Sequence, residues 1–121
     1  MSKDILVVDD QPGIRLLLKA ILMREGYNVT TASNGREAFK LLSRGNYDLV
    51  ILDYRLPILD GVGVLEEMKQ FKRKIPAVIM SGLAEKIENE LSAYPQVKLV
   101  LAKPFNIDDI PVIVKQSLNR D

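Results

Sequence analysis

Residues 5–10 have the sequence Ile-Leu-Val-Val-Asp-Asp, in which a run of four apolar residues leads into two acids. A short, continuous run rich in branched side chains is typical of a strand buried on both faces of a parallel sheet. The same pattern returns in residues 48–53, Asp-Leu-Val-Ile-Leu-Asp, and three further runs resemble it. We therefore predict strands at Ile5–Val8, Val29–Ala32, Leu49–Leu52, Ala77–Met80 and Leu99–Ala102, of which the second is the weakest.

Longer segments with helical spacing alternate with these strands. We predict helices at residues 12–25, 35–43, 61–72, 84–93 and 108–119. Asn34 and Asp60 are suited to be N-caps, and Pro111 belongs in the first turn of the last helix, where the missing N–H costs least. Strands that alternate with helices predict an α/β domain whose parallel sheet is covered by helices on both faces.

Composition and charge exclude several classes of function. The 121 residues suffice for one domain, and a net charge of +1 predicts no strong attraction to nucleic acid or to a membrane. The chain has no histidine and no cysteine, which removes Ser-His-Asp and Cys-His catalysis, the usual zinc sites and disulfides. No apolar run reaches the roughly 18 residues of a membrane span. We expect a cytoplasmic protein whose chemistry uses carboxylates, hydroxyls, lysine and a hard cation.

Polar residues follow the predicted core strands at their carboxyl ends, namely Asp9, Asp10, Asp53, Ser81 and Lys103. Because these ends meet at one edge of a parallel sheet, we expect the five side chains to share a cleft. An oxygen-only site suits Mg²⁺, and Asp53 could then attack a phosphorus atom while Lys103 and Ser81 offset charge on its oxygens. Each residue alone could be a turn former, a cap or a surface charge. Their joint placement favours the functional interpretation.

These motifs together resemble the receiver domain of response regulators, the CheY-like family, over essentially the whole chain. The resemblance implies a flavodoxin-like, doubly wound (βα)5 fold with a five-stranded parallel sheet in the order 2-1-3-4-5. We expect a single receiver domain over residues 1–121 with no output domain, so that it would act through another protein. Within the family, the sequence looks most like the single-domain sporulation phosphotransferases of bacilli, which are phosphorelay intermediates. The matching segments are residues 5–10, 48–53, 56–61, 78–81 and 102–105, and, for the narrower likeness, 9–15 and 103–110.

The resemblance implies a role for each acid of the site. Asp9 and Asp10 would organise Mg²⁺, with Asp10 and Asp53 as direct ligands and Arg55 lending its backbone carbonyl. Asp53 would accept a phosphoryl group from a phosphohistidine on a sensor histidine kinase or a histidine phosphotransferase. Such a protein is a phosphotransfer relay rather than an ordinary enzyme, although it catalyses its own phosphorylation and dephosphorylation.

The resemblance also implies how the phosphorylated state is sensed. Ser81 would be the switch hydroxyl and Lys103 the phosphate-binding lysine, joined to Pro104 by a cis peptide bond. The family often has Tyr or Phe three residues before this lysine, where the ring moves inward upon activation. Val100 stands there in this chain, so the aromatic part of the usual switch is absent.

The predicted first helix has two apolar stripes. Ile14, Leu17, Leu18, Ile21 and Leu22 form a broad core face, and Leu16, Ala20 and Met23 form a second stripe nearly opposite. The second stripe fits docking against a helical partner and fits scattered surface residues equally well. The resemblance implies that histidine-bearing helices contact Gln11, Ile14, Leu83 and Phe105. We expect the second stripe to extend that contact or to form the seam of a weak homodimer of a protein that is otherwise monomeric.

Two other functions stay open. A Mg²⁺-dependent phosphohydrolase could use Asp53 as its nucleophile, but such enzymes typically want a second acid two residues later, where Arg55 stands. A receiver-like module could also signal by protein contacts without phosphotransfer. The acids and Lys103 argue against that alternative, whereas Val100 keeps it open.

Overall fold

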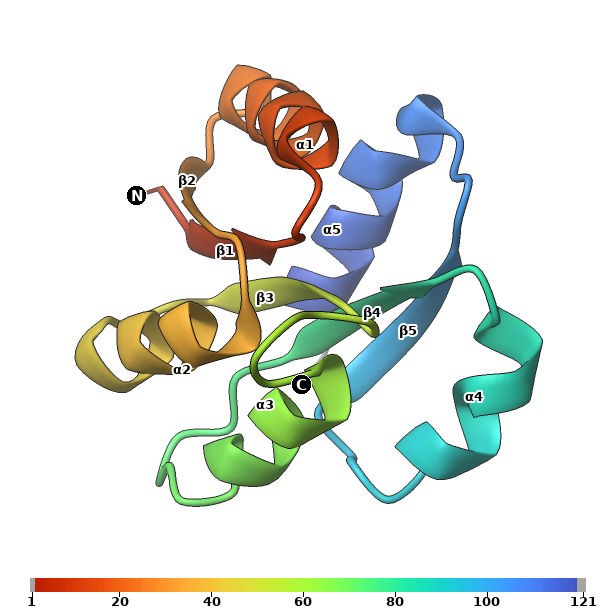
Figure 1. Ribbon diagram of the computed structural model, residues 1–121. Coiled ribbons are helices and arrows are strands. Elements are labelled where there is room, and N and C mark those ends of the chain that lie inside the picture. Colours follow the sequence, from red (N-terminus) through yellow and green to blue (C-terminus); the bar gives the residue numbers. More distant parts are fainter. Residues whose placement is uncertain (1, 120–121) are drawn as a thin grey trace.

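The computed structural model describes residues 2–119, in which parallel strands and helices alternate as the sequence predicts (Figure 1). The strands are β1 (Asp4–Val8), β2 (Asn28–Ala32), β3 (Leu49–Asp53), β4 (Ala77–Ser81) and β5 (Val97–Ala102). The helices are α1 (Pro12–Arg24), α2 (Gly35–Arg44), α3 (Gly61–Met68), α4 (Ala84–Leu91) and α5 (Ile110–Leu118), with a short 3₁₀ turn at Ile107–Asp109 before α5.

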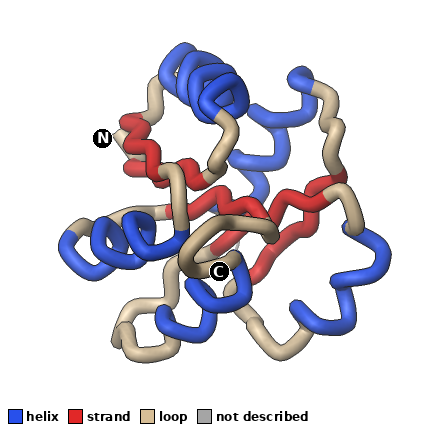
Figure 2. The backbone as a smooth tube through the Cα atoms, viewed as in Figure 1, coloured by secondary structure: helices blue, strands red, loops and turns tan. Residues whose placement is uncertain are grey.

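The strands form one parallel sheet in the order β2-β1-β3-β4-β5, which confirms the predicted flavodoxin-like topology. Helices lie on both sides of this sheet, with α1 and α5 on one face and α2, α3 and α4 on the other (Figure 2). Alternate residues of each strand point to opposite faces, so Ile5 and Val7 pack under α1 and α5, whereas Leu6 and Val8 pack against the other layer. This double burial explains why the strands are continuous apolar runs.

The predicted helix starts are confirmed where polar caps specify them. The Asn34 side chain accepts a hydrogen bond from the Glu37 N–H at 2.8 Å, and Asp60 accepts one from the Gly63 N–H at 2.8 Å. Pro111 lies in the first turn of α5, as predicted. That helix begins at Ile110 rather than at residue 108, because the Asn106 side chain caps a separate 3₁₀ turn.

Two details of the helix predictions are wrong. The third helix ends at Met68 rather than at residue 72, because the next three N–H groups bond to carbonyls only three residues back and tighten the chain into turns. In α1, Leu18 and Leu22 are fully buried, but Leu17 is 36% exposed because it lies at the flank of the buried stripe. None of the helices within residues 2–119 is long and apolar enough to cross a membrane.

The loop between β3 and α3 contains a strained residue. Ile58 has a φ of 72°, and the Leu59 N–H bonds to the Pro57 carbonyl at 2.8 Å across it. This is a γ-turn of the rarer hand, with a branched residue in the left-handed region, which costs about 1–2 kcal/mol. The Ile58 side chain is 77% exposed, so burial offsets little of that cost.

Candidate functional site

Three carboxylates meet at the carboxyl edge of the sheet. Oxygen atoms of Asp9, Asp10 and Asp53 all lie within 4.8 Å of one another. They meet because β1 and β3 are paired, with Val8 opposite Leu52, so the acids that end the two strands are neighbours. Asp9 and Asp53 are buried and Asp10 is exposed, which leaves the cluster open to solvent on one side.

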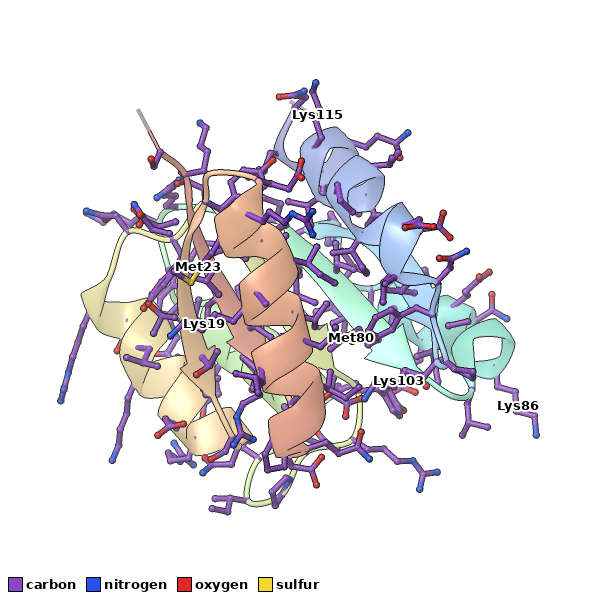
Figure 3. The ribbon with its side chains drawn as sticks, turned by 90° about the horizontal axis from the view of Figure 1, so that it is seen from above. Lys19, Met23, Met80, Lys86, Lys103 and Lys115 are labelled. Atoms are coloured by element: carbon purple, nitrogen blue, oxygen red, sulfur yellow. The ribbon has the colours of Figure 1, made fainter. Side chains whose placement is uncertain are left out.

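Lys103 completes this cluster from the end of β5. Its Nζ lies 2.6 Å from Asp9 Oδ2 and 3.2 Å from Asp53 Oδ2. The Lys103 N–H bonds to the Ser81 carbonyl at 2.9 Å, and the Lys103–Pro104 peptide is cis, as expected. Viewed from above, Lys103 lies near Met80 at the end of the sheet toward which the strands point, whereas Lys115 lies toward the opposite end (Figure 3).

The electrostatics of the cluster favour a bound cation. Burial and the neighbouring charge of Asp9 raise the pKa of Asp53. Lys103 and a backbone hydrogen bond from Arg55 lower it, but they offset only part of the rise. Burial alone would lower the pKa of Lys103, but its hydrogen bonds to the carboxylates and their charges outweigh burial and raise that pKa. One ammonium therefore pairs with two of the three carboxylates, and Asp10 has no ion-pair partner within the described chain. The donor set is entirely oxygen, which fits Mg²⁺.

Ser81 lies at the same edge but is not joined to the acids. Its side chain is buried, and its Oγ accepts a hydrogen bond from the Leu83 N–H at 2.9 Å. Within residues 2–119, no hydrogen bond links this hydroxyl to a carboxylate of the cluster. Because Oγ acts as an acceptor here, its own proton is free to donate toward a group bound at Asp53.

Arg55 lies beside the acids on the loop that follows β3. The residues that line a pocket there are Asp10, Tyr54, Arg55, Leu56, Pro57 and Asp60. The Arg55 side chain is exposed, and its backbone is the part of the residue that contacts the site. The structure thus brings Asp9, Asp10, Asp53 and Lys103 together at one edge of the sheet, where the Arg55 backbone N–H bonds to the Asp53 carboxylate.

Two contacts near the acids were missed by sequence reasoning. The Tyr54 hydroxyl donates to Glu90 Oε2 at 2.7 Å, which ties the residue after Asp53 to α4. Tyr54 and Val100 pack against the same core cluster, the one under α2, α3 and α4. An aromatic ring therefore contacts this cluster although residue 100 is not aromatic. The Arg15 Nη1 donates to the Asp9 carbonyl at 2.7 Å. Glu90 lies 36 residues from Tyr54 and gave no sequence signal, whereas Arg15 stands five residues after Asp10 in the predicted first helix.

The predicted partner-binding residues fall into two groups. Gln11 and Leu83 are exposed, and Leu16 is 72% exposed. Ile14 and Phe105, by contrast, are partly buried and pack against the core under α1 and α5. In the second stripe of α1, Ala20 is exposed and Met23 is 55% exposed, so this stripe is free of the domain's own core.

Comparison with known proteins gives consistent matches over the whole domain. The family described as response regulator receiver domain matches residues 5–115. Sporulation initiation phosphotransferase F of Bacillus subtilis is 38% identical over 98% of this chain and 95% of its own length. The alkaline phosphatase synthesis transcriptional regulatory protein of the same organism is also 38% identical, but the chain spans only 50% of its length. The response regulator TrrA of Thermotoga maritima, solved in complex with Mg²⁺-BeF, has a TM-score of 0.83 and 40% identity, covering 95% of this chain and 98% of that one.

Proposed function

The chain belongs to the response-regulator receiver family, and we propose that it is a phosphorelay intermediate. In this proposal, Asp53 accepts a phosphoryl group from a phosphohistidine on a partner and passes it to a downstream phosphotransferase. The observation that carries the proposal is the Lys103 ammonium, which lies 2.6 Å from Asp9 and 3.2 Å from Asp53. A fixed cation beside a buried carboxylate can stabilise the charge of phosphoryl oxygens during transfer.

The proposed transfer uses three side chains of this protein. A carboxylate oxygen of Asp53 attacks phosphorus in line with the donor imidazole nitrogen. The oxygen–phosphorus bond forms as the phosphorus–nitrogen bond breaks, and the bonding electron pair stays on the imidazole. Lys103 donates to one phosphoryl oxygen, and the free proton of the Ser81 hydroxyl donates to another. The same step in reverse, with a second histidine, passes the group on.

We propose Mg²⁺ as the cofactor. Asp9 and Asp10 would organise the ion, Asp10 and Asp53 would bind it directly, and Arg55 would contribute its backbone carbonyl. When bound, the ion would supply positive charge that offsets the carboxylates and the phosphoryl oxygens. The oxygen-only cluster supports this proposal, as does the relative of Thermotoga maritima solved with Mg²⁺-BeF.

We propose that residues 1–121 work as one receiver domain in the cytoplasm, mainly as a monomer. Its partners would be a sensor histidine kinase and a histidine phosphotransferase. The support is the relative named a sporulation initiation phosphotransferase, whose length this chain covers to 95%. The domain would be a phosphotransfer relay rather than an ordinary enzyme, and it would catalyse its own phosphorylation and dephosphorylation.

The direct test uses phosphoramidate, a small donor with the same phosphorus–nitrogen bond as phosphohistidine. The protein is incubated with phosphoramidate and Mg²⁺, and the added group is located by intact mass and peptide mapping. We expect one label, on the peptide that contains Asp53, and no label when EDTA replaces Mg²⁺. A protein that stays unlabelled, or is labelled elsewhere, would instead favour a module that signals by contact alone.

The exposed stripe of α1 is the proposed extension of the partner surface. Substituting both Leu16→Lys and Met23→Lys should slow phosphotransfer from a phosphorylated histidine phosphotransferase about 10-fold, or weaken self-association, while the phosphoramidate rate stays unchanged. The matched control is Val112→Lys, because Val112 is 56% exposed on α5, close to the 55% of Met23. Quenched time courses measure the rate of phosphotransfer, and sedimentation velocity measures self-association. If neither property changes, the stripe is incidental.

A further inference from the structure

Arg15 makes a contact that the proposed transfer chemistry does not use. It lies at the end of the first turn of α1, is partly buried, and donates from Nη1 to the Asp9 backbone carbonyl at 2.7 Å. That carbonyl belongs to the peptide that joins Asp9 to Asp10. A charged donor at this distance makes a strong hydrogen bond, so the guanidinium fixes the plane of this peptide.

The orientation of this peptide decides whether both acids can serve one ion. In a continuing strand, successive side chains point to opposite faces of the sheet. Yet Asp9 and Asp10 each offer an oxygen within 4.8 Å of the other and of Asp53. The chain must therefore turn directly after β1, which ends at Val8. Arg15 holds the carbonyl at the position of this turn.

The two acids depend on this peptide to different degrees. The carboxylate of Asp9 is held on both oxygens, by the Gln11 N–H at 2.9 Å and by Lys103 at 2.6 Å. The backbone N–H of Asp9 donates to the Ala32 carbonyl at 3.2 Å. The carboxylate of Asp10 is exposed and has no hydrogen-bond partner within the described chain. The backbone therefore sets the direction of the Asp10 Cα–Cβ bond, and with it the region that the carboxylate can reach.

We propose that Arg15 is a positioning residue that aims Asp10 at the cation site by fixing the Asp9–Asp10 peptide. The inference rests on the proposed function in one respect, namely that the acid cluster binds Mg²⁺. Residues that orient metal ligands through a hydrogen bond typically change metal affinity 10-fold or more when they are removed. We expect loss of Arg15 to lower the Mg²⁺ affinity about 10-fold, because Asp10 depends on Arg15 and the other ligands are held by other contacts.

Three variants separate the hydrogen bond from the charge. Arg15→Met keeps the apolar stem and removes the donors, whereas Arg15→Lys keeps one donor group. Arg24→Met removes the same charge from the exposed last turn of the same helix. Mg²⁺ affinity is measured by calorimetric titration. We expect binding about 10-fold weaker in Arg15→Met, within about 3-fold of wild type in Arg15→Lys, and unchanged in Arg24→Met.

A second readout does not require the metal. In the Mg²⁺-free protein, the NMR amide resonance of Asp10 should move in Arg15→Met and stay in place in Arg24→Met. The proposal is overturned if Arg15→Met folds and keeps both its Mg²⁺ affinity and this resonance, or if Arg24→Met loses as much affinity. Should Arg15→Met fail to fold, Arg15→Gln takes its place, because it keeps a polar side chain but loses the charge and the reach of the guanidinium; it should show the same loss of affinity and the same shift of the resonance. Failure of the proposed function would give a different result. The wild-type protein would then acquire no phosphoryl group at Asp53, independently of the Mg²⁺ affinities of the Arg15 variants.

Discussion

Replacing Asp53 with asparagine should abolish phosphoryl uptake and, at neutral pH without Mg²⁺, raise the melting temperature of the protein. An amide of the same shape has no nucleophilic oxygen, so the label from phosphoramidate should fall at least 100-fold, to background. The gain in stability follows from the site itself. Asp53 is buried beside Asp9, and burial and that charge raise its pKa. Its ionised form is thus disfavoured in the folded state.

The sign of the pH dependence follows from this pKa shift. A carboxylic acid whose pKa is raised by folding stabilises the fold below its unfolded pKa, which is about 3.9. That contribution is lost as the pH rises through the folded pKa of Asp53. The stability advantage of Asp53→Asn should therefore be small near pH 4, grow as the pH rises, and be largest near pH 7. Added Mg²⁺ should reduce the advantage, because it stabilises the ionised wild type.

Thermal melts at pH 4 and pH 7, combined with intact mass spectrometry, measure both effects. Asp108→Asn is the control, because Asp108 is an exposed acid outside the cluster and its loss should change neither the label nor the pH dependence. A variant that still acquires the label would show that Asp53 is not the acceptor. A lower melting temperature for Asp53→Asn at pH 7 would show that the contacts of the Asp53 carboxylate with Lys103 and Arg55 outweigh its burial and the repulsion from Asp9.

The sheet and its acids could be predicted because each strand carries its own signal. A run buried on both faces must be apolar throughout, and an acid at its end is conspicuous, as in Leu49–Asp53. The register then requires that Asp9 and Asp53 be neighbours. Ser81 shows the limit of such reasoning. The edge of the sheet fixes where the residue lies, but the Leu83 N–H determines what its hydroxyl contacts.

The remaining features depend on contacts that no local pattern encodes. The bond from Tyr54 to Glu90 requires the packing of α4, and the bond from Arg15 to the Asp9 carbonyl requires the position of α1 relative to the end of β1. The γ-turn at Ile58 escaped prediction for another reason, because left-handed positions are usually marked by Gly or Asn. Here a branched residue occupies one, and the loop geometry overrides its preference.

The β3–α3 loop also depends on a glycine outside it, and this gives the largest expected loss of stability. Gly35 is the buried first residue of α2, and a Cβ built on it would lie 1.7 Å from the backbone oxygen of Leu59. Backbone cannot rotate away as a side chain can, so either the start of α2 or the loop must move. We expect Gly35→Ala to lower the free energy of unfolding by about 3 kcal/mol. The melting temperature should fall by on the order of 10 °C.

The matched control is the same substitution in an open position. A Cβ on Gly13, in the first turn of α1, would meet nothing within 4 Å. Gly13→Ala should therefore raise stability slightly, by about 0.5–1 kcal/mol, because alanine is the better helix former. Urea unfolding of both variants measures the difference. If Gly35→Ala unfolds within 0.5 kcal/mol of wild type, about the spread of ordinary surface substitutions, the close approach of α2 to the loop is incorrect.

The same variant tests whether the loop and the acid cluster are mechanically connected. Leu59 follows the segment that contains Arg55 and Pro57, and these two line the pocket beside Asp10. A loop displaced by the new methyl group would carry the Arg55 backbone away from Asp53, to whose carboxylate it now bonds. Gly35→Ala should then be labelled by phosphoramidate more slowly than wild type, even at temperatures where it is fully folded. A normal rate in the folded variant would mean that α2 moves instead and that the loop keeps its place at the site.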